Sequence, residues 1–290
     1  MLNLEARAEI ITIARRDAHD YYLSALLGQP GARDDLLVLA AFEGELSRII
    51  ATVADPILAE IRLQWWSETV AAMEGAHQSG HPVADALSKL VTTGRVSTAS
   101  LARSIDARSA DTGADPITTD EDLDRYLDST EGAALARSIA IITAITGIAT
   151  PPTALIEAAG RSVGLVRVLL ELPRQRAMDR PFLLPLNPIP TTPSTSDQRA
   201  VEVDAGDEAS RQADQCRKYA DSARRYLDDV RQGWAEMSRW HRAALGPVAL
   251  VGPYLKGLQR VGYLEPHPAG VITPISRVAR LWWAVRFARA

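Results

Sequence analysis

The sequence predicts an all-α protein, and three observations support that fold class. Apolar residues recur at steps of three and four along most of the 290 residues, which is the spacing of one face of a helix. No segment shows the strict alternation of apolar and polar residues that is typical of a half-buried strand. Prolines, which interrupt both kinds of element, are concentrated between residues 181 and 193.

The clearest helix is expected at residues 34–53, where Leu36, Leu39 and Phe42 begin one apolar stripe. A second helix starts at Pro56, because proline suits the first helical position. The same periodicity predicts further helices at 4–27, 83–94, 97–110, 119–147, 152–178, 200–231, 234–260 and 274–288.

One long break, residues 180–196, carries too many prolines for a helix interior or a central strand. The helices predicted on both sides have wide apolar faces, and the composition does not change across the break. We therefore expect a surface loop within a single domain that spans residues 1–290, in preference to a linker between two domains.

Composition argues against several classes of protein. With 32 basic and 36 acidic residues the formal charge is −4, so a uniformly basic nucleic-acid binder is not expected. Cys216 is the only cysteine, which leaves no internal disulfide and no thiolate metal site. The longest mostly apolar run, residues 139–149, is about half the ~20 residues that span a bilayer. The first twenty residues fit no targeting peptide. We expect a cytoplasmic protein without a transmembrane segment.

Asp124 and Asp128 are spaced so that both carboxylates lie on one helix face, where they would chelate Mg²⁺ bound to a diphosphate. Acidic residues are also typical of the first turn of a helix, here with Thr118, Thr119 or Asp120 as the cap. We favour the structural interpretation of this pair.

The segment 275–289, which includes most of the last predicted helix, combines four arginines with Trp282, Trp283 and Phe287, a composition found in membrane-surface helices. Its arginines are spread around the helix instead of forming one polar face. Docking on the protein core, with the arginine heads reaching water, is the favoured interpretation.

Several segments, in order along residues 10–290, carry a family resemblance. DAHDYYLSALL (17–27), AFEGELSR (41–48) and EIRLQWW (60–66) resemble the opening of the squalene/phytoene synthase family. Leu172-Pro173, followed by PFLLP (181–185), resembles its second signature region. The resemblance implies a single-domain isoprenoid-synthase-like fold, a helical bundle around a central cavity. For active members it also implies head-to-head condensation of two prenyl diphosphates on Mg²⁺ held by two aspartate-rich helices.

The residues that hold metal in the active members are replaced here. The aspartate positions of the first motif fall on Ser47, Arg48 and Ala51. In the second motif at most one carboxylate, Glu171, remains, and we expect Pro173 to interrupt the helix that carries it. This pattern is similar to the branch of the family that contains a mitochondrial respiratory complex I assembly factor, whose members are thought to be non-catalytic.

Two functions follow from the resemblance. The first is a non-catalytic isoprenoid-binding protein or respiratory-complex assembly factor that needs no metal and no cofactor. Its expected partners are a prenyl diphosphate or prenyl lipid in the cavity, a respiratory complex subunit, and the inner membrane through peripheral contact. The alternative is a Mg²⁺-dependent head-to-head prenyltransferase that uses the acids that remain, Glu43 and the Asp124–Asp128 pair among them.

Candidate site residues come from the same comparison with the family. The catalytic candidates, for an active enzyme, are Glu45, Arg48, Glu171 and Gln175. The substrate-binding candidates are Arg48, Arg167, Arg174 and Tyr22. No metal site is expected, and the candidate ligands in the event of metal binding are Glu45 and Glu171. Glu45 is expected to pair with Arg48 one turn later.

Overall fold

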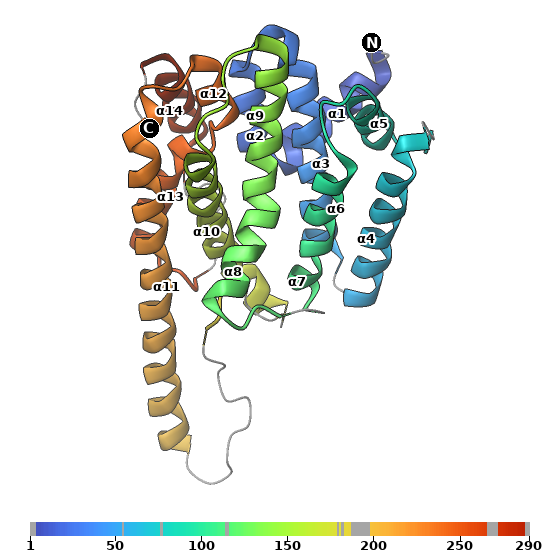
Figure 1. The fold of residues 1–290 in the computed structure, drawn as a ribbon. Coiled ribbons are helices and arrows are strands. Elements are labelled where there is room, and N and C mark those ends of the chain that lie inside the picture. The colour runs from blue at the N-terminus through green and yellow to red at the C-terminus, as the bar shows by residue number, and fades with distance from the viewer. Residues whose placement is uncertain are drawn as a thin grey trace.

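The structure, a computed structural model, describes residues 4–53, 55–75, 78–113, 116–178, 180, 183–186, 198–265 and 272–287. For residues 198–209 it describes the backbone alone. Every regular element in these ranges is a helix (Figure 1), which confirms the all-α prediction.

The helices follow one another along the chain with short connections. They are α1 (Leu4–Asp17), α2 (His19–Leu27), α3 (Arg33–Thr52), α4 (Pro56–Ala71), α5 (Pro82–Thr92), α6 (Thr98–Ala107), α7 (Ser109–Thr112), α8 (Asp120–Leu127), α9 (Ala133–Thr146), α10 (Thr153–Ala177), α11 (Gln198–Trp234), α12 (Arg239–Ala244), α13 (Val248–Val261) and α14 (Pro274–Phe287). Two 3-10 turns, η1 (Pro30–Ala32) and η2 (Met73–Gly75), and one π-helical turn, η3 (Asp128–Gly132), complete the described elements.

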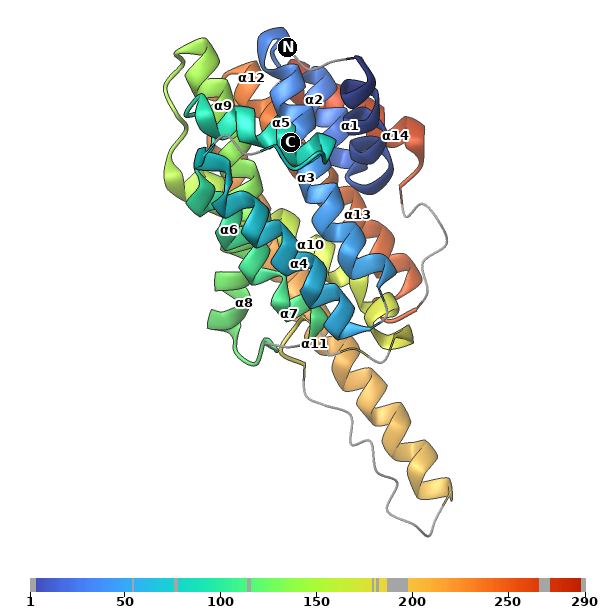
Figure 2. The same cartoon turned by 90° about the vertical axis from the view of Figure 1, so that its right-hand side faces the viewer.

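Helix α3 lies within the core, because apolar side chains cover most of its circumference and 12 of its 20 residues are buried. It contacts α1, α2, α5 and α9, while α10 packs along α11 and against η3 and α13. Helices α4 and α6 lie on one side of the bundle and α11 and α13 on the other (Figure 1). The first half of α11 extends past the remaining helices (Figure 2).

Side-chain caps explain where several helices begin. Asp55 accepts a hydrogen bond from the backbone amide of Ile57 at the start of α4, and Ser97 does the same for Ser100 in α6. Thr119 caps α8, as one of the three predicted caps. These bonds satisfy amide groups that have no partner within the helix.

Several predicted helices are divided in the structure. The helix expected at 4–27 breaks at Ala18, whose φ of −138° and ψ of 52° are not helical. The helix expected at 234–260 breaks at Gly246, where an added Cβ would lie 2.2 Å from the Ser24 hydroxyl oxygen. The helix expected at 97–110 becomes α6 and α7, and that expected at 119–147 contains the π-helical turn η3. The apolar period continues across each break, so the sequence pattern does not reveal them.

The prediction that Pro173 interrupts its helix is wrong, because α10 continues through this residue to Ala177. Proline lacks the amide hydrogen that the interior of a helix requires, which costs about 3 kcal/mol. Leu169 and Leu172 beside it are fully buried. Packing of this face therefore outweighs the lost hydrogen bond.

Of the proline-rich segment the structure describes Arg180 and residues 183–186, and the remainder of the predicted loop lies outside the described residues. The helices before and after it contribute to one hydrophobic core. Helix α14 docks on α2, α12 and α13 through Leu281, Ala284 and Val285, as predicted. None of the helices in the described ranges combines the length and hydrophobicity needed to cross a bilayer.

Candidate functional site

Ionisable side chains, six of them buried and two half-buried, gather at the centre of the bundle, where three arginines face three carboxylates and two tyrosines. We call this set the buried charge cluster: Tyr21, Glu43, Arg108, Asp111, Tyr126, Glu131, Arg137 and Arg167. A charge buried alone is very unfavourable, so such a set persists only when its members pair.

Arg137 of α9 and Glu43 of α3 form one side of the cluster, with 2.6 Å between Nη2 and Oε1. Each residue is only 4% exposed, so the pair is fully desolvated. The other terminal nitrogen of Arg137 donates to the Ser100 carbonyl at 2.8 Å and to the Ser104 hydroxyl at 3.0 Å. The Arg137–Glu43 pair and its serine contacts therefore join α3, α6 and α9. Arg108 also approaches Glu43, at 3.6 Å.

Arg167 of α10 forms the other side of the cluster. Its Nε atom lies 2.7 Å from Oε1 of Glu131, and its Nη2 atom donates to the Tyr126 hydroxyl at 2.5 Å. That hydroxyl donates in turn to Asp111 at 2.8 Å. The Tyr21 hydroxyl donates to Glu131. These contacts connect α2 through η3, α10 and α8 to α7.

Burial raises the pKa of both tyrosines, Tyr21 and Tyr126, above the usual value of a phenol. The Glu131 carboxylate adds to the rise at Tyr21. Burial opposes the charge of Arg167, but the Tyr126 hydroxyl, Glu131 and Asp111 outweigh it and raise its pKa. The tyrosines are therefore neutral donors, and Arg167 stays charged.

Close packing of glycines brings Glu131 to this position. Gly160 of α10 lies so near η3 that an added Cβ would be 2.4 Å from the Gly132 Cα atom. At Gly164 an added Cβ would lie 2.6 Å from the Leu127 side chain. Because neither residue has a Cβ, α10 reaches η3, and Arg167 meets Glu131 one turn further along. Such π-helical turns are frequent at functional sites.

Two pockets adjoin the cluster and share Asp17, Ser47 and Arg167. The first, here the inner pocket, has a volume of about 220 Å³, and its apolar side is formed by Val163, Val166, Leu170, Pro247 and Val251. The second, here the arginine pocket, has a volume of about 470 Å³, and its charged lining is Arg16, Asp17, Arg48, Arg108, Asp111, Arg167, Glu171 and Arg174. The inner pocket also has charged lining residues, Glu43 and Glu131 among them, and it shares a boundary with the arginine pocket.

Cations outnumber carboxylates in the arginine pocket, since five arginines and three acids line it. Arg48 is exposed, and among the described residues no carboxylate pairs with it. Guanidinium groups bind phosphate oxygens through paired N–H donors. The lining is therefore suited to an anion with several oxygens.

A second polar group closes the inner pocket. Asp20 of α2 accepts from the Tyr254 hydroxyl at 2.8 Å and pairs with Arg277 of α14 at 3.1 Å. Burial raises the pKa of Asp20, while Arg277 acts in the opposite direction. The first and last parts of the chain therefore meet at this wall.

Four of the residues proposed from the sequence come together in the arginine pocket: Arg48, Arg167, Glu171 and Arg174. Glu171 and Arg174 form an ion pair within α10. Among them only Arg167 also belongs to the buried charge cluster.

The other three proposed residues line neither of the two pockets. Glu45 is half-buried near Arg16, and within the described part of the chain no ion pair joins it to Arg48. Gln175 is buried, and its side-chain oxygen accepts from the backbone of Leu183 at 3.3 Å. Tyr22 lies beside the His19 ring, whereas its neighbour Tyr21 lines the inner pocket.

Most of the buried charge cluster was not anticipated from the sequence. Arg137 could have been found from the sequence, because it is the only charged residue in the mostly apolar α9 and must therefore have a buried partner. Arg108, Asp111 and Glu131 lie in polar stretches that resemble solvated helix surfaces. Only the packing of α6, α7 and η3 shows that they are buried.

The aspartates on α8 and η3 hold an arginine of α10. Arg161 lies 3.1 Å from Asp124 and 2.8 Å from Asp128. Both carboxylates therefore already have a cation, and their structural role is to hold Arg161 and not, as predicted, to serve the first turn of the helix.

The donor set does not fit the Mg²⁺ sites that the resemblance implies. In the described ranges no three His, Cys, Asp or Glu side chains are grouped to hold a metal ion. Asp17 pairs with Arg16, Glu171 with Arg174, and the carboxylates of the cluster with its arginines. Mg²⁺ prefers free carboxylates and water, and here the cations are supplied by arginine.

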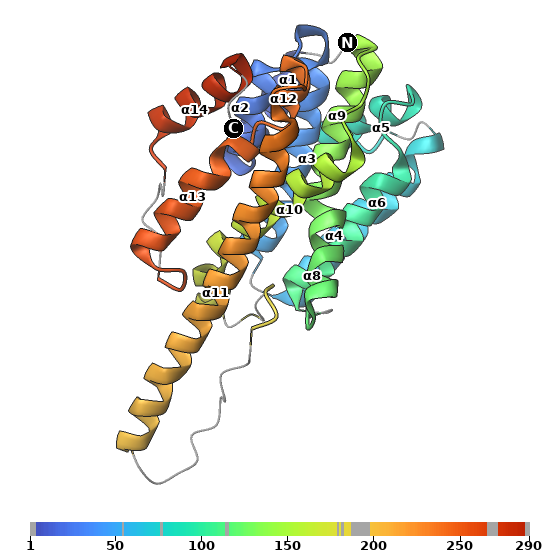
Figure 3. The same ribbon diagram turned by 60° about the vertical axis from the view of Figure 1, so that its left-hand side comes forward.

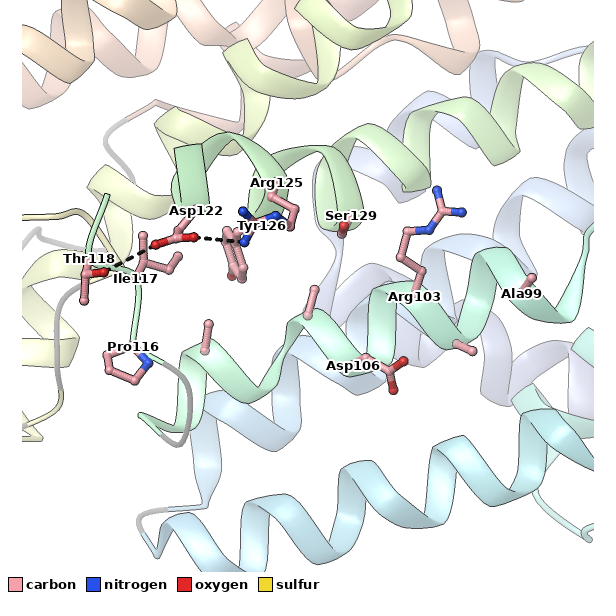
Figure 4. Close-up of a pocket in the computed structure, with 13 residues that line it drawn as sticks. Ala99, Arg103, Asp106, Pro116, Ile117, Thr118, Asp122, Arg125, Tyr126 and Ser129 are labelled. Carbon is pink, nitrogen blue, oxygen red and sulfur yellow. Dashed lines mark hydrogen bonds and ion pairs between the residues drawn. The ribbon is translucent and has the colours of Figure 1, made fainter. Parts of the chain in front are cut away.

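A third, wider pocket of about 620 Å³ lies between α6 and α8 (Figure 4). Asp122 accepts from Thr118 and pairs with Arg125 at its rim. Tyr126 forms part of its wall while its hydroxyl bonds to Asp111 of the cluster. This tyrosine therefore separates the open groove from the buried charges.

Comparisons with known proteins agree with this architecture. The family model described as squalene/phytoene synthase matches residues 14–274. A dehydrosqualene synthase solved in complex with a ligand has a TM-score of 0.72 at 14% identity, covering 98% of this chain and 96% of its own. Squalene synthase HpnC from Alicyclobacillus acidocaldarius has a TM-score of 0.59 at 15% identity, covering 89% of this chain and 95% of its own. A search of curated proteins gives no significant match. The fold is therefore that of these synthases, and the chain belongs to the squalene/phytoene synthase family.

Proposed function

We propose that this protein binds a prenyl diphosphate, or a prenyl lipid with a phosphate head, without a metal ion and without condensing prenyl chains. The observation that supports this function is the arginine pocket, where Arg48 stands at a position that the resemblance assigns to an aspartate. Arginine supplies the positive charge that a metal ion would otherwise bring to a diphosphate.

In this proposal the arginine pocket binds the diphosphate and the inner pocket binds the start of the prenyl chain. Arg48, Arg167 and Arg174 face the phosphate oxygens from α3 and α10. The apolar wall of the inner pocket, including Val163 and Val251, receives the start of the prenyl chain. Arg167 is held in place by Glu131, so the anion meets a preformed donor.

Titration with farnesyl diphosphate tests this function, once with Mg²⁺ and once with a chelator. We expect equal affinity in both, and a loss of about tenfold for Arg48→Gln and for Arg174→Gln, since a hydrogen bond to a charged group contributes about 1.5–3 kcal/mol. Arg217→Gln is the matched control, because Arg217 pairs with Asp214 on the exposed surface of α11. Binding that disappears with the chelator contradicts the proposal.

The alternative function is the Mg²⁺-dependent head-to-head prenyltransferase, and family membership favours it. It is tested by incubating the protein with farnesyl and geranylgeranyl diphosphates, Mg²⁺ and NADPH. If the wild type forms a hydrocarbon product and Glu171→Gln does not, the protein is a catalyst and the non-catalytic function is contradicted. Folded protein that binds farnesyl diphosphate and releases no diphosphate supports the non-catalytic function.

A role in assembling a respiratory complex at the inner membrane is the second part of the proposal. It is supported by the resemblance to the assembly-factor branch and by an exposed apolar stripe on α4 formed by Ile57, Leu58, Ile61 and Trp65. Deletion of the gene is expected to lower NADH:quinone oxidoreductase activity in membranes. Restoration by the wild type but not by Ile57→Asp/Ile61→Asp would support α4 as the docking face, and unchanged activity after deletion would contradict this role.

A further inference from the structure

Helix α14 exposes a cluster of aromatic rings on the face that points away from the core. Trp282, Trp283 and Phe287 are 49%, 48% and 44% exposed. Their ring centroids lie 4.3–6.5 Å apart, so they form one patch instead of separate side chains. Ile275 and Val278 extend it along the helix. Large exposed rings of this kind mark an interaction surface.

A basic pocket of about 490 Å³ lies between α13 and α14. Its three cationic residues are Lys256 and Arg260 of α13 and Arg280 of α14, and no carboxylate is among its lining residues. Within the described part of the chain none of the three forms an ion pair with an acidic side chain. Thr273, Ser276 and Gln259 add polar donors. This lining is complementary to a phosphate group.

The pocket and the rings share one side of α14. Ser276, Arg280, Trp283 and Phe287 are spaced by four, three and four residues, which places them along one stripe of the helix. No acidic residue occurs in α14. A surface that meets this stripe therefore contacts the rings and the cations together.

We propose that α14 and the adjoining end of α13 bind an anionic lipid bilayer, with the rings at the level of the head groups and the basic pocket on a lipid phosphate. Tryptophan prefers the membrane–water interface, and each nearby cation adds about fivefold to the affinity for an anionic surface. The opposite face of α14 holds Leu281 and Ala284 in the core, as expected for a helix that lies in the plane of a membrane surface.

The exposed apolar stripe of α4 differs from the α14 surface in the charge of the helix that carries it. Helix α4 carries two acids, Glu60 and Glu68, against one arginine, Arg62, so its net charge is negative and opposes contact with anionic lipid, whereas α14 carries arginines alone. Helices α4 and α14 lie on opposite sides of the molecule (Figures 1 and 3). The charge complementarity to lipid is therefore specific to the α14 surface.

Vesicle flotation tests this proposal with the full-length protein and no prenyl ligand, so its outcome is independent of the proposed function. The vesicles are phosphatidylcholine alone and phosphatidylcholine mixed with phosphatidylglycerol. We expect binding to the mixed vesicles, loss of binding in Trp282→Ala/Trp283→Ala, and affinity about fivefold lower for Arg260→Gln. Ile57→Ala/Ile61→Ala, which removes even more exposed apolar side chains from α4, should bind vesicles like the wild type.

Three results would overturn the proposal. The first is equal binding to neutral and mixed vesicles, and the second is full binding by the double tryptophan variant. The third is that the protein binds no vesicles but forms a dimer that the tryptophan substitutions abolish. In that case the aromatic rings of α14 contact a second copy of the chain and not a lipid bilayer. Should the double variant unfold by circular dichroism, Arg280→Gln and Lys256→Gln give the same test, since both side chains lie at the surface.

Discussion

The Nε atom of Arg167 lies 2.7 Å from the Oε1 atom of Glu131, and this ion pair joins α10 to the π-helical turn η3. Arg167 is also the residue shared by the buried charge cluster, the inner pocket and the arginine pocket. The pair therefore couples the stability of the bundle centre to the position of a proposed anion donor.

Glu131→Gln is expected to destabilise the fold by about 3 kcal/mol, because it removes a buried carboxylate that is the nearest charge partner of Arg167 and leaves that arginine only Asp111, at 3.8 Å. Urea unfolding measures the change in the free energy of unfolding. Glu121→Gln is the control, since Glu121 is exposed in the first turn of α8 and should change stability by about 0.5 kcal/mol or less. Equal stability of the two variants would show that the pair contributes nothing.

Gly160→Ala is expected to destabilise by about 1–3 kcal/mol, because its Cβ would lie 2.4 Å from the Gly132 Cα atom and force α10 away from η3. Gly75→Ala provides the comparison, since an added Cβ there meets nothing within 4 Å. The same urea experiment measures both. A stable Gly160→Ala protein that binds farnesyl diphosphate normally would contradict the importance of this close approach.

His241 makes stability depend on pH. Its ring is buried, and burial lowers the pKa of His241 below the ordinary 6.5. The unfolded chain then binds a proton more readily than the folded one, so stability that is complete above 6.5 is lost as the pH falls below it. Melting temperatures between pH 5 and 7.5 should fall on the acid side, with a shallower slope in His241→Gln. If the melting temperature of His241→Gln falls with pH as steeply as that of the wild type, ionisable groups other than His241 cause the pH dependence.

Cys216 should be inert in the folded protein. Its side chain is inaccessible, and burial raises the pKa of the Cys216 thiol to about 12, so almost no thiolate forms near neutral pH. A chromogenic disulfide reagent is expected to react slowly with native protein and rapidly in urea. Fast labelling without denaturant would reveal local opening of α11.

Helix periodicity was sufficient to predict the fold class and most helices, including α3 with its apolar stripe. Positions where tertiary packing overrides a local pattern were not predictable, such as the break at Ala18 and the continuation through Pro173. The arginine pocket was partly predictable because Arg48 and Arg167 occupy motif positions. The cluster around Arg108 was not, since its partners are distant in sequence and polar in composition.

The wall formed by Asp20, Tyr254 and Arg277 also has a consequence for biosynthesis. The hydrogen bond from Tyr254 to Asp20 spans 234 residues, and the ion pair with Arg277 spans more. While the ribosome still holds α14, Asp20 lacks its Arg277 partner, and the high sequence separation makes this contact slow to form. A chain that ends before α14 would leave a carboxylate unpaired beside an open apolar pocket, a state that chaperones and proteases recognise. Closure of the pocket therefore has to wait until α14 has left the ribosome.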